Sequence, residues 1–193
     1  SWRTDVGGVT DETGYVIFGR NNDGDVVATT SAKWLDWSDT HFKAEAESLR
    51  FFYEDPERDK APGEACVVTA PNATEVSGAI LHTGGAWYRP DMRGRQLARI
   101  IPRCGRAYAG MRWPIDNVCG IISDFNTRSG FERRTGYHSV TRWVTMTNSP
   151  SYPGQEIRLV LVGLTGDQLF QDSADFLDSF ETEVDTRVGA RRA

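Results

Sequence analysis

Apolar and polar positions alternate or recur along the chain in a way that divides it into strand-like and helix-like segments. The first strand pair is Gly14–Arg20, rich in apolar β-formers, and a returning segment at residues 25–37. Residues 21–24 (NNDG) lie between them, and their Asp-Gly pair favours a tight hairpin turn because both central residues accept positive φ. We therefore predict a β-hairpin early in the chain.

Short apolar runs predict five further strands. Gly84 and Gly85 interrupt one of these runs, which indicates a β-bulge or the close approach of another group. The predicted strands are residues 64–70, 78–88, 115–124, 137–147 and 156–164.

Three segments place apolar residues every three or four positions, which is typical of amphipathic helices. They are residues 40–52, 93–113 and 167–184, and a shorter polar helix is expected at residues 126–135. Pro102 should kink or split the second helix, because proline removes a backbone hydrogen bond. The predicted inward-facing residues are Leu97, Ile100, Ile101, Cys104, Tyr108 and Met111 in the second helix and Leu169, Phe170, Ala174, Leu177 and Phe180 in the third.

This order of strands and helices predicts one α/β (α+β) domain with a mixed sheet. We place the domain at residues 14–186, after an N-terminal loop or truncated start at residues 1–13 and before a tail at residues 187–193. The chain begins at Ser1 without Met and shows no signal peptide, so a missing N-terminal segment stays open.

Composition narrows the class of protein. The 193 residues are 39% hydrophobic and 25% charged, which fits a soluble globular domain, and no window approaches the roughly 18 apolar residues of a membrane span. The three cysteines are widely spaced and odd in number, which predicts reduced thiols in or near the core of a cytoplasmic protein. The three histidines have no metal-binding spacing, so we expect no metal.

The net charge of −5 argues against a dedicated nucleic-acid binder, a class that is usually basic. Positive charge is nevertheless concentrated locally, because six of the 22 Lys and Arg residues lie between Arg89 and Arg106.

This basic segment, residues 88–98 (YRPDMRGRQLA), lies between a predicted strand and a predicted helix. A helix start offers unpaired backbone N–H groups and the positive end of the helix dipole, and together these bind anions. Gly94 lets the backbone approach a ligand, and Arg93, Arg95 and Arg89 add charge that suits phosphates.

The segment resembles motif A of the GNAT (GCN5-related N-acetyltransferase) superfamily. Arg93 matches the leading Arg or Gln of the phosphate loop, Gly94 the glycine after it and Ala98 its closing Gly or Ala, while Gln96 stands where the family usually has glycine. The resemblance implies a mixed, mostly antiparallel central sheet with helices on both faces. It also implies acetyl-CoA or another acyl-CoA as co-substrate, bound by Trp87, Tyr88, Arg93, Gly94, Arg95, Gln96, Leu97, Ala98 and Asn126.

The implied reaction is the direct attack of an amine on an acyl-CoA thioester, with loss of a proton from the amine. His82, on the strand expected to flank the thioester, is the candidate base, and its alternative is a hydrogen-bonded structural histidine. The family often places its acid, a tyrosine, four residues before the Gly of a Gly-Phe pair, and Glu132 occupies that position here. Tyr137 is the remaining candidate acid, or else a core residue.

Two other functions stay open at this stage. The chain is alternatively a GNAT-like CoA-binding or regulatory module without catalysis, as Gln96 and the missing tyrosine suggest, or an α/β module that binds nucleic acid or protein through residues 93–106. The acceptor amine is not identified. The acidic helix at residues 167–185 either exposes its charged face to solvent and packs along an apolar stripe, or it provides a homodimer contact.

Overall fold

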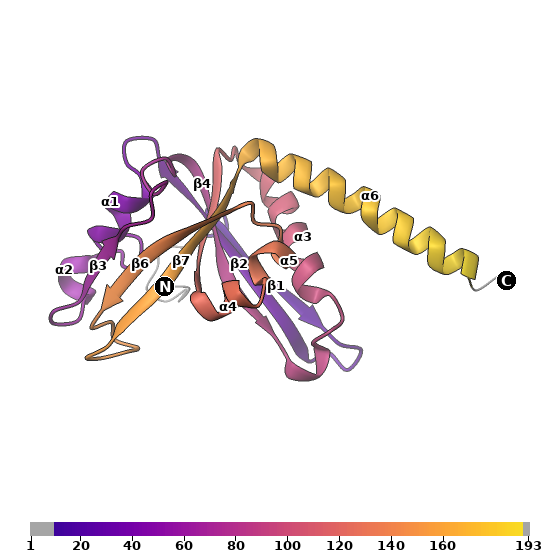
Figure 1. Cartoon of the computed structure of the whole chain (residues 1–193), viewed down its shortest axis with the longest axis horizontal. Coiled ribbons are helices and arrows are strands. Elements are labelled where there is room, and N and C mark those ends of the chain that lie inside the picture. Colours follow the sequence, from indigo (N-terminus) through magenta and orange to yellow (C-terminus); the bar gives the residue numbers. More distant parts are fainter. Residues whose placement is uncertain (1–9, 191–193) are drawn as a thin grey trace.

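The computed structural model describes residues 10–190, with side chains through Ser179, and contains one seven-stranded sheet (Figure 1). The strand order is β1-β2-β4-β5-β7-β6-β3. The strands are β1 (Gly14–Arg20), β2 (Val26–Trp37), β3 (Ala65–Val68), β4 (Gly78–Tyr88), β5 (Asn117–Ser123), β6 (Ser139–Thr147) and β7 (Glu156–Thr165). The expected loop at residues 1–13 lies mostly outside the described residues.

All neighbouring strands pair antiparallel except β4 and β5, which are parallel. The helices are α1 (Phe42–Glu47), α2 (Pro56–Asp59), the 3₁₀ turn η1 (Pro90–Met92), α3 (Leu97–Arg112), α4 (Asp124–Arg128), α5 (Phe131–Thr135) and α6 (Gly166–Ala190). The predicted hairpin and the bounds of the predicted strand at Gly78–Tyr88 are confirmed.

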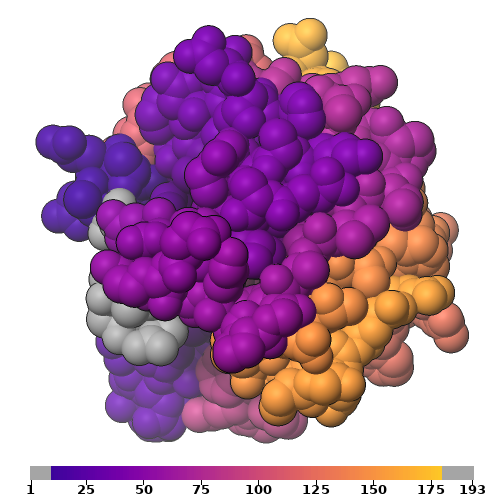
Figure 2. Space-filling view, turned by 90° about the vertical axis from the view of Figure 1, so that its left-hand side faces the viewer, coloured from indigo at the N-terminus to yellow at the C-terminus, as the bar shows by residue number. Residues whose placement is uncertain are grey.

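Each face of the sheet has its own apolar core. Ile80 and Cys119 point to the face covered by α1, whereas their neighbours Leu81 and Val118 point to the face covered by α3 and α6. Figure 2 looks onto the side where the segment containing α1 and α2 lies. The structure confirms the predicted fold class, a mixed, mostly antiparallel sheet with helices on both faces.

Helix α3 faces the sheet differently from the prediction. Pro102 lies within one continuous helix, and the buried residues are Gly105, Arg106 and Ala109. The prediction of an inward face through Cys104, Tyr108 and Met111 was wrong, since all three are exposed. The physical reason is close packing: a Cβ at position 105 would lie 2.9 Å from the hydroxyl of Tyr15, so glycine at this position lets α3 lie close to β1.

Helix α6 also presents an unpredicted face. Leu169 is buried as expected, but Phe170, Ala174 and Leu177 are exposed, and Asp172 is buried instead. The carboxylate of Asp172 pairs with arginines of α3, and this pairing fixes the rotation of the helix. The helix extends to Ala190, past the predicted end at residue 184, and projects away from the sheet (Figure 1); the side chain of Phe180 lies outside the described residues.

Candidate functional site: a cleft between two diverging strands

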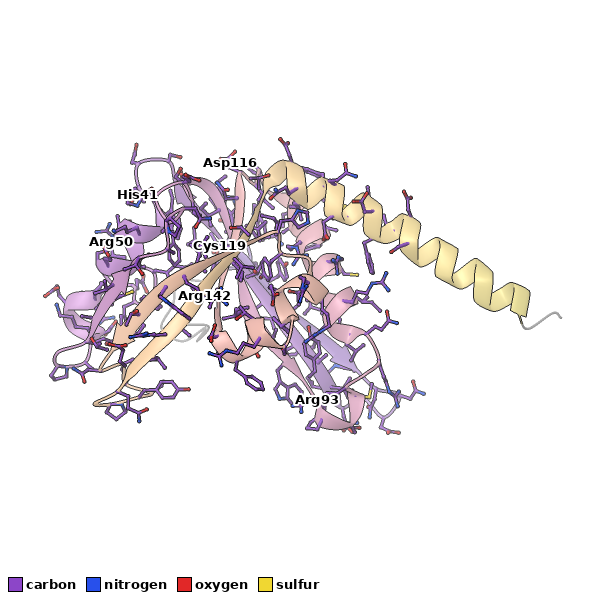
Figure 3. The ribbon with its side chains drawn as sticks, in the orientation of Figure 1. His41, Arg50, Arg93, Asp116, Cys119 and Arg142 are labelled. Atoms are coloured by element: carbon purple, nitrogen blue, oxygen red, sulfur yellow. The ribbon has the colours of Figure 1, made fainter. Side chains whose placement is uncertain are left out.

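The two parallel strands at the centre of the sheet separate part-way along their length. β4 and β5 pair over Ile80–Leu81–His82 and Asn117–Val118–Cys119, and beyond His82 no register between them continues. Both strands nevertheless run on, β4 to Tyr88 and β5 to Ser123. Cys119 therefore marks the point, near the middle of the sheet in Figure 3, where the strands begin to part.

A pocket of about 270 Å³ fills this gap on the face of the sheet that α3 covers. Its lining residues come from both diverging strands, from β1 and β2, and from α3, α4 and α5. They are Tyr15, Thr30, Ser31, Thr83, Gly84, Gly85, Ala86, Pro102, Arg106, Ile121, Ile122, Ser123, Asn126, Phe131, Thr135 and Tyr137. Among these lining residues, none is acidic and none is a histidine.

The glycine pair of β4 borders the gap through a bulge. The pairing of β2 with β4 shifts register between Thr29 and Ser31, and the two hydroxyls donate to the carbonyls of Gly85 and Gly84, at 2.7 and 3.1 Å. Gly85 has φ +59°, and a Cβ there would lie 2.4 Å from the Ser31 hydroxyl. A side chain here would be strained and would displace the Ser31 hydroxyl, and the β4 backbone at the glycine pair forms part of the pocket wall.

Tyr137 reaches the gap from the segment that leads into β6. Its hydroxyl lies 2.5 Å from the hydroxyl of Thr83 on β4, and the Thr83 hydroxyl donates to the Cys119 carbonyl on β5 at 3.3 Å. Burial raises the pKa of Tyr137, and the nearby Arg106 guanidinium opposes that shift. The phenol is thus protonated at neutral pH and positioned between the two strands.

Arg106 forms a charged part of the pocket wall. The side chain is 1% exposed, and its guanidinium carbon lies 5.4 Å from the centre of the Tyr137 ring. Nη2 donates to the Thr135 carbonyl at 2.6 Å and to Asp172 Oδ2 at 3.3 Å. Nε and Nη1 have no hydrogen-bond partner among the described residues. Asp172 also accepts two hydrogen bonds from Arg103, both at 3.0 Å, so two arginines share one carboxylate.

The loop before α3 is open and exposed at Gly94 and its neighbouring arginines. Gly94 has φ +80°, and a Cβ built there meets nothing within 4 Å. Arg93 and Arg95 are exposed and form no ion pair with the described residues, whereas Arg89 is paired with Asp91. Arg93 lies at the start of α3, far from Asp116 at the opposite end of the sheet in Figure 3.

Gln96 occupies a backbone conformation that glycine adopts easily. It is the N-cap of α3 with φ +60°, and no side chain caps the helix. Arg99 donates to Gln96 Oε1 at 3.0 Å, which holds the glutamine side chain along the first turn. The left-handed conformation costs a non-glycine residue about 1 kcal/mol. Gln96 therefore adopts, at that cost, a backbone conformation that glycine adopts more easily.

His82 does not line the pocket. Its ring faces the α1 side of the sheet and meets the edge of Phe51 at 4.5 Å between ring centroids, and its Nδ1 lies 3.4 Å from the Cys119 carbonyl. Burial lowers the pKa of His82 to about 3. Glu132, at the position where the resemblance implies a tyrosine, is buried, with Arg133 3.6 Å from its carboxylate, and also stays outside the pocket lining.

The other predicted cofactor-binding residues divide into three groups. Asn126 lines the pocket from α4, and its backbone N–H is held by the Ser123 hydroxyl. Leu97 and Ala98 form the first turn of α3. Trp87 is half exposed, whereas the hydroxyl of Tyr88 is buried without a hydrogen-bond partner among the described residues; burial raises its pKa to about 12. Neither aromatic residue lines the pocket.

Sequence reasoning missed Arg106, Thr83 and Ser31. A usable signal existed for the first, because Gly105 and Ala109 are small residues spaced by one helical turn, and such pairs mark the face that packs closely. Nothing in the sequence indicates that Thr83 and Ser31 meet the gap, since this depends on the strand register.

The cysteine prediction was wrong for Cys104, which is exposed, and right for the buried Cys66 and Cys119.

Comparisons with known proteins give structural neighbours only. No family model matches the chain, and no curated protein matches it. An aminoglycoside acetyltransferase in complex with coenzyme A and kanamycin is 10% identical, with 83% of this chain and 71% of that chain covered and a TM-score of 0.46. A variant of the spermidine N-acetyltransferase SpeG from Vibrio cholerae is 6% identical, with 82% and 69% covered and a TM-score of 0.48. NAA60 of Arabidopsis thaliana in complex with acetyl-CoA is 12% identical, with 76% and 70% covered and a TM-score of 0.45.

In the described part of the chain, no group of three or more His, Cys, Asp and Glu side chains is arranged to hold a metal ion. None of the described helices has the combination of length and apolar character needed to cross a membrane.

Proposed function

We propose that this protein is an N-acyltransferase that moves an acetyl or other acyl group from acyl-CoA to an amine. The observation that carries the proposal is the separation of β4 from β5 beyond His82, which opens a pocket between a bare backbone edge and the Tyr137 hydroxyl. Arg93 and Arg95, which form no ion pair with the described residues, directly precede the uncapped start of α3, the helix that supplies Pro102 and Arg106 to the pocket.

The spacing along α3 fits one extended substrate. At about 1.5 Å per residue, Pro102 lies about 7 Å along the helix axis from Leu97, and Arg106 lies about 13 Å from it. Arg93, Arg95 and the amides at the helix start would hold the pyrophosphate. The pantetheine arm would then follow α3 into the pocket, which brings the thioester to the place where β4 and β5 part.

Groups of this chain account for two requirements of the reaction, stabilisation of the oxyanion and protonation of the departing sulfur. The amine nitrogen attacks the thioester carbonyl carbon, the C–S bond breaks, the amine loses a proton and the departing sulfur gains one. A backbone N–H on the free edge of β4, at Gly84–Gly85–Ala86, would stabilise the oxyanion. Tyr137 would donate its proton to the sulfur, and Arg106 beside its ring would stabilise the phenolate left behind.

In this proposal, no side chain of the pocket removes the proton from the amine. No carboxylate or histidine is among the residues that line the pocket. The low pKa of His82 makes it a weak base toward an ammonium whose pKa is about 10. We therefore assign proton removal to water at the open end of the pocket, with the amine entering unprotonated.

Two measurements test the function. Isothermal titration should show that the protein binds CoA, and the absence of heat and of thermal stabilisation at millimolar CoA would contradict the proposal. Thiol release from acetyl-CoA should accelerate in the presence of an amine panel. CoA binding without thiol release across polyamines, amino acids and peptide N-termini would favour the alternative of a non-catalytic CoA-binding module.

The proposal includes a cellular location and an oligomeric state that the sequence predicts. A cytoplasmic location fits the reduced state of the cysteines, of which Cys66 and Cys119 are buried with the pKa of each thiol raised to about 12. A homodimer contact through α6 fits the exposure of Phe170 and Leu177. Sedimentation of the protein with and without Leu177→Asp tests that contact, because a dimer held there would dissociate.

A further inference from the structure

The only formal charge on the pocket lining is the guanidinium of Arg106. Its side chain is almost fully buried, and both Nε and Nη1 lack a hydrogen-bond partner in the described structure. A buried, unpaired donor on a charged group is costly, and a charged group is expected to find an acceptor when its site is complete. Arg106, a residue of the pocket wall, therefore has two cationic N–H donors that the described residues do not satisfy.

The charged groups around Arg106 include more positive than negative side chains. Asp172 is the only carboxylate within ion-pair distance of Arg106 in the described structure, and it binds Arg103 through both oxygens. His138 is also near Asp172, at 3.9 Å. One carboxylate thus faces two guanidinium groups, and the cluster keeps a net positive charge next to the pocket.

The position of Arg106 separates it from the phosphates of CoA. It lies about 13 Å along the axis of α3 from the helix start, whereas Arg93 and Arg95 precede that start. Its guanidinium stands over the ring of Tyr137, whose hydroxyl marks the parting of β4 and β5. The pantetheine arm is uncharged, so the charge at Arg106 has no counterpart in CoA at this depth.

We infer that this pocket binds a substrate carboxylate at Arg106, next to the reacting thioester. The inference rests on the proposed acyl transfer and adds the substrate class to it. Nε–H and Nη1–H point to different edges of the planar group, so a carboxylate oxygen at Arg106 accepts a charge-assisted hydrogen bond from one of them. That carboxylate belongs either to the acyl group, as in the monothioester of a dicarboxylic acid, or to the acceptor, as in an amino acid.

Two pairs of ligands, compared on the wild-type protein, distinguish a carboxylate of the acyl group from a carboxylate of the acceptor. The first titrates succinyl-CoA against 4-methylpentanoyl-CoA, in which an isopropyl group replaces the carboxylate, without any amine. The second measures acetyl transfer to glycine and to glycinamide at equal concentrations of unprotonated amine. A carboxylate that accepts a charge-assisted hydrogen bond from the guanidinium should gain about tenfold in affinity or in kcat/KM in one comparison.

A matched pair of variants assigns the preference to Arg106. Arg106→Met removes the buried guanidinium while Asp172 keeps its two hydrogen bonds from Arg103, and it should abolish the preference. Arg112→Met removes the same charge from an exposed position of the same helix, outside the pocket lining, and should leave the preference intact. The wild-type comparisons stand even when Arg106→Met fails to fold.

The outcomes separate this inference from the function on which it rests. A preference for succinyl-CoA assigns the carboxylate to the acyl group, and a preference for glycine assigns it to the acceptor. CoA binding with neither preference overturns the inference and leaves the acyltransferase proposal standing. Failure to bind CoA at all overturns both, and a preference that persists in a folded Arg106→Met protein overturns the role of Arg106.

Discussion

The hydroxyls of Tyr137 and Thr83 lie 2.5 Å apart, across the point where β4 and β5 stop pairing. The two residues are 54 positions apart in the chain. Thr83 also donates to the Cys119 carbonyl on β5, so a short chain of hydrogen bonds joins Tyr137 to both diverging strands. The contact fixes the direction of the phenol at the mouth of the gap.

This contact predicts a loss of rate without a loss of binding in Tyr137→Phe. Removing the phenolic proton should lower kcat by roughly 100-fold, in the range of a lost general acid, because sulfur then leaves as a thiolate without a proton donor. CoA affinity by titration should change little. Tyr108→Phe is the matched control, since Tyr108 lies on the outer side of α3 and is 41% exposed. Equal rates in both variants would remove Tyr137 as the acid.

Arg93→Ala should weaken CoA binding through the loss of a phosphate contact. We expect a reduction of about threefold to tenfold that becomes smaller as salt rises, because the site is exposed and screened. Titration with pantetheine, which lacks the pyrophosphate, should give the same affinity in the variant and the wild type. Arg128→Ala, which removes another exposed arginine, is the control. A variant that binds CoA normally at low salt would place the pyrophosphate elsewhere.

His82 should make the fold less stable as the pH falls. Its pKa in the folded protein is about 3, below the ordinary value of 6.5, so the unfolded chain binds an additional proton between these values. Stability is therefore full above pH 6.5 and declines toward pH 3, by at most about 1.4 kcal/mol per pH unit from this group. Urea denaturation from pH 7 to pH 4 should show a shallower decline in His82→Asn.

The same variant tests the role of His82 in catalysis. Because the ring lies outside the pocket lining, His82→Asn should keep the pH dependence of kcat/KM unchanged in a folded protein. An acid limb of the rate profile that disappears in the variant would instead restore His82 as the base.

Asp172→Asn should destabilise the protein strongly. The substitution leaves the buried Arg106 and the partly buried Arg103 without a carboxylate, and breaking a buried pair of this kind costs about 3–5 kcal/mol. Asp175→Asn is the matched control on the exposed side of the same helix, with an expected change within about 0.5 kcal/mol. Free energies of unfolding from urea titration decide the matter, and similar values for the two variants would contradict the prediction.

Local patterns predicted the elements whose cause is local. The Asp-Gly turn between β1 and β2 and the strand Gly78–Tyr88 follow from residues adjacent in the chain, and the structure contains both. Gly94 was expected to let the backbone approach a ligand, which stays a prediction, and the structure gives it a positive φ of +80°. These features need no distant partner, because turn geometry and strand alternation are properties of short segments.

The faces of α3 and α6 could not be read from apolar periodicity, because charged residues occupy their interior. Arg106 is buried since Asp172, 66 positions away, meets it there. A prediction from apolar periodicity assigns every charged residue to the solvent side. It therefore placed the packing face of each helix at the wrong position around the helix axis.

The sequence by itself determined the order of the strands, the early hairpin and the basic turn before α3. Only the tertiary structure decided that β4 and β5 part beyond His82, that Tyr137 enters the gap and that a guanidinium lines it. The reason is physical: a strand's partners, and the charge that compensates a buried arginine, come from segments far away in the chain, and their energies are realised only when those segments meet.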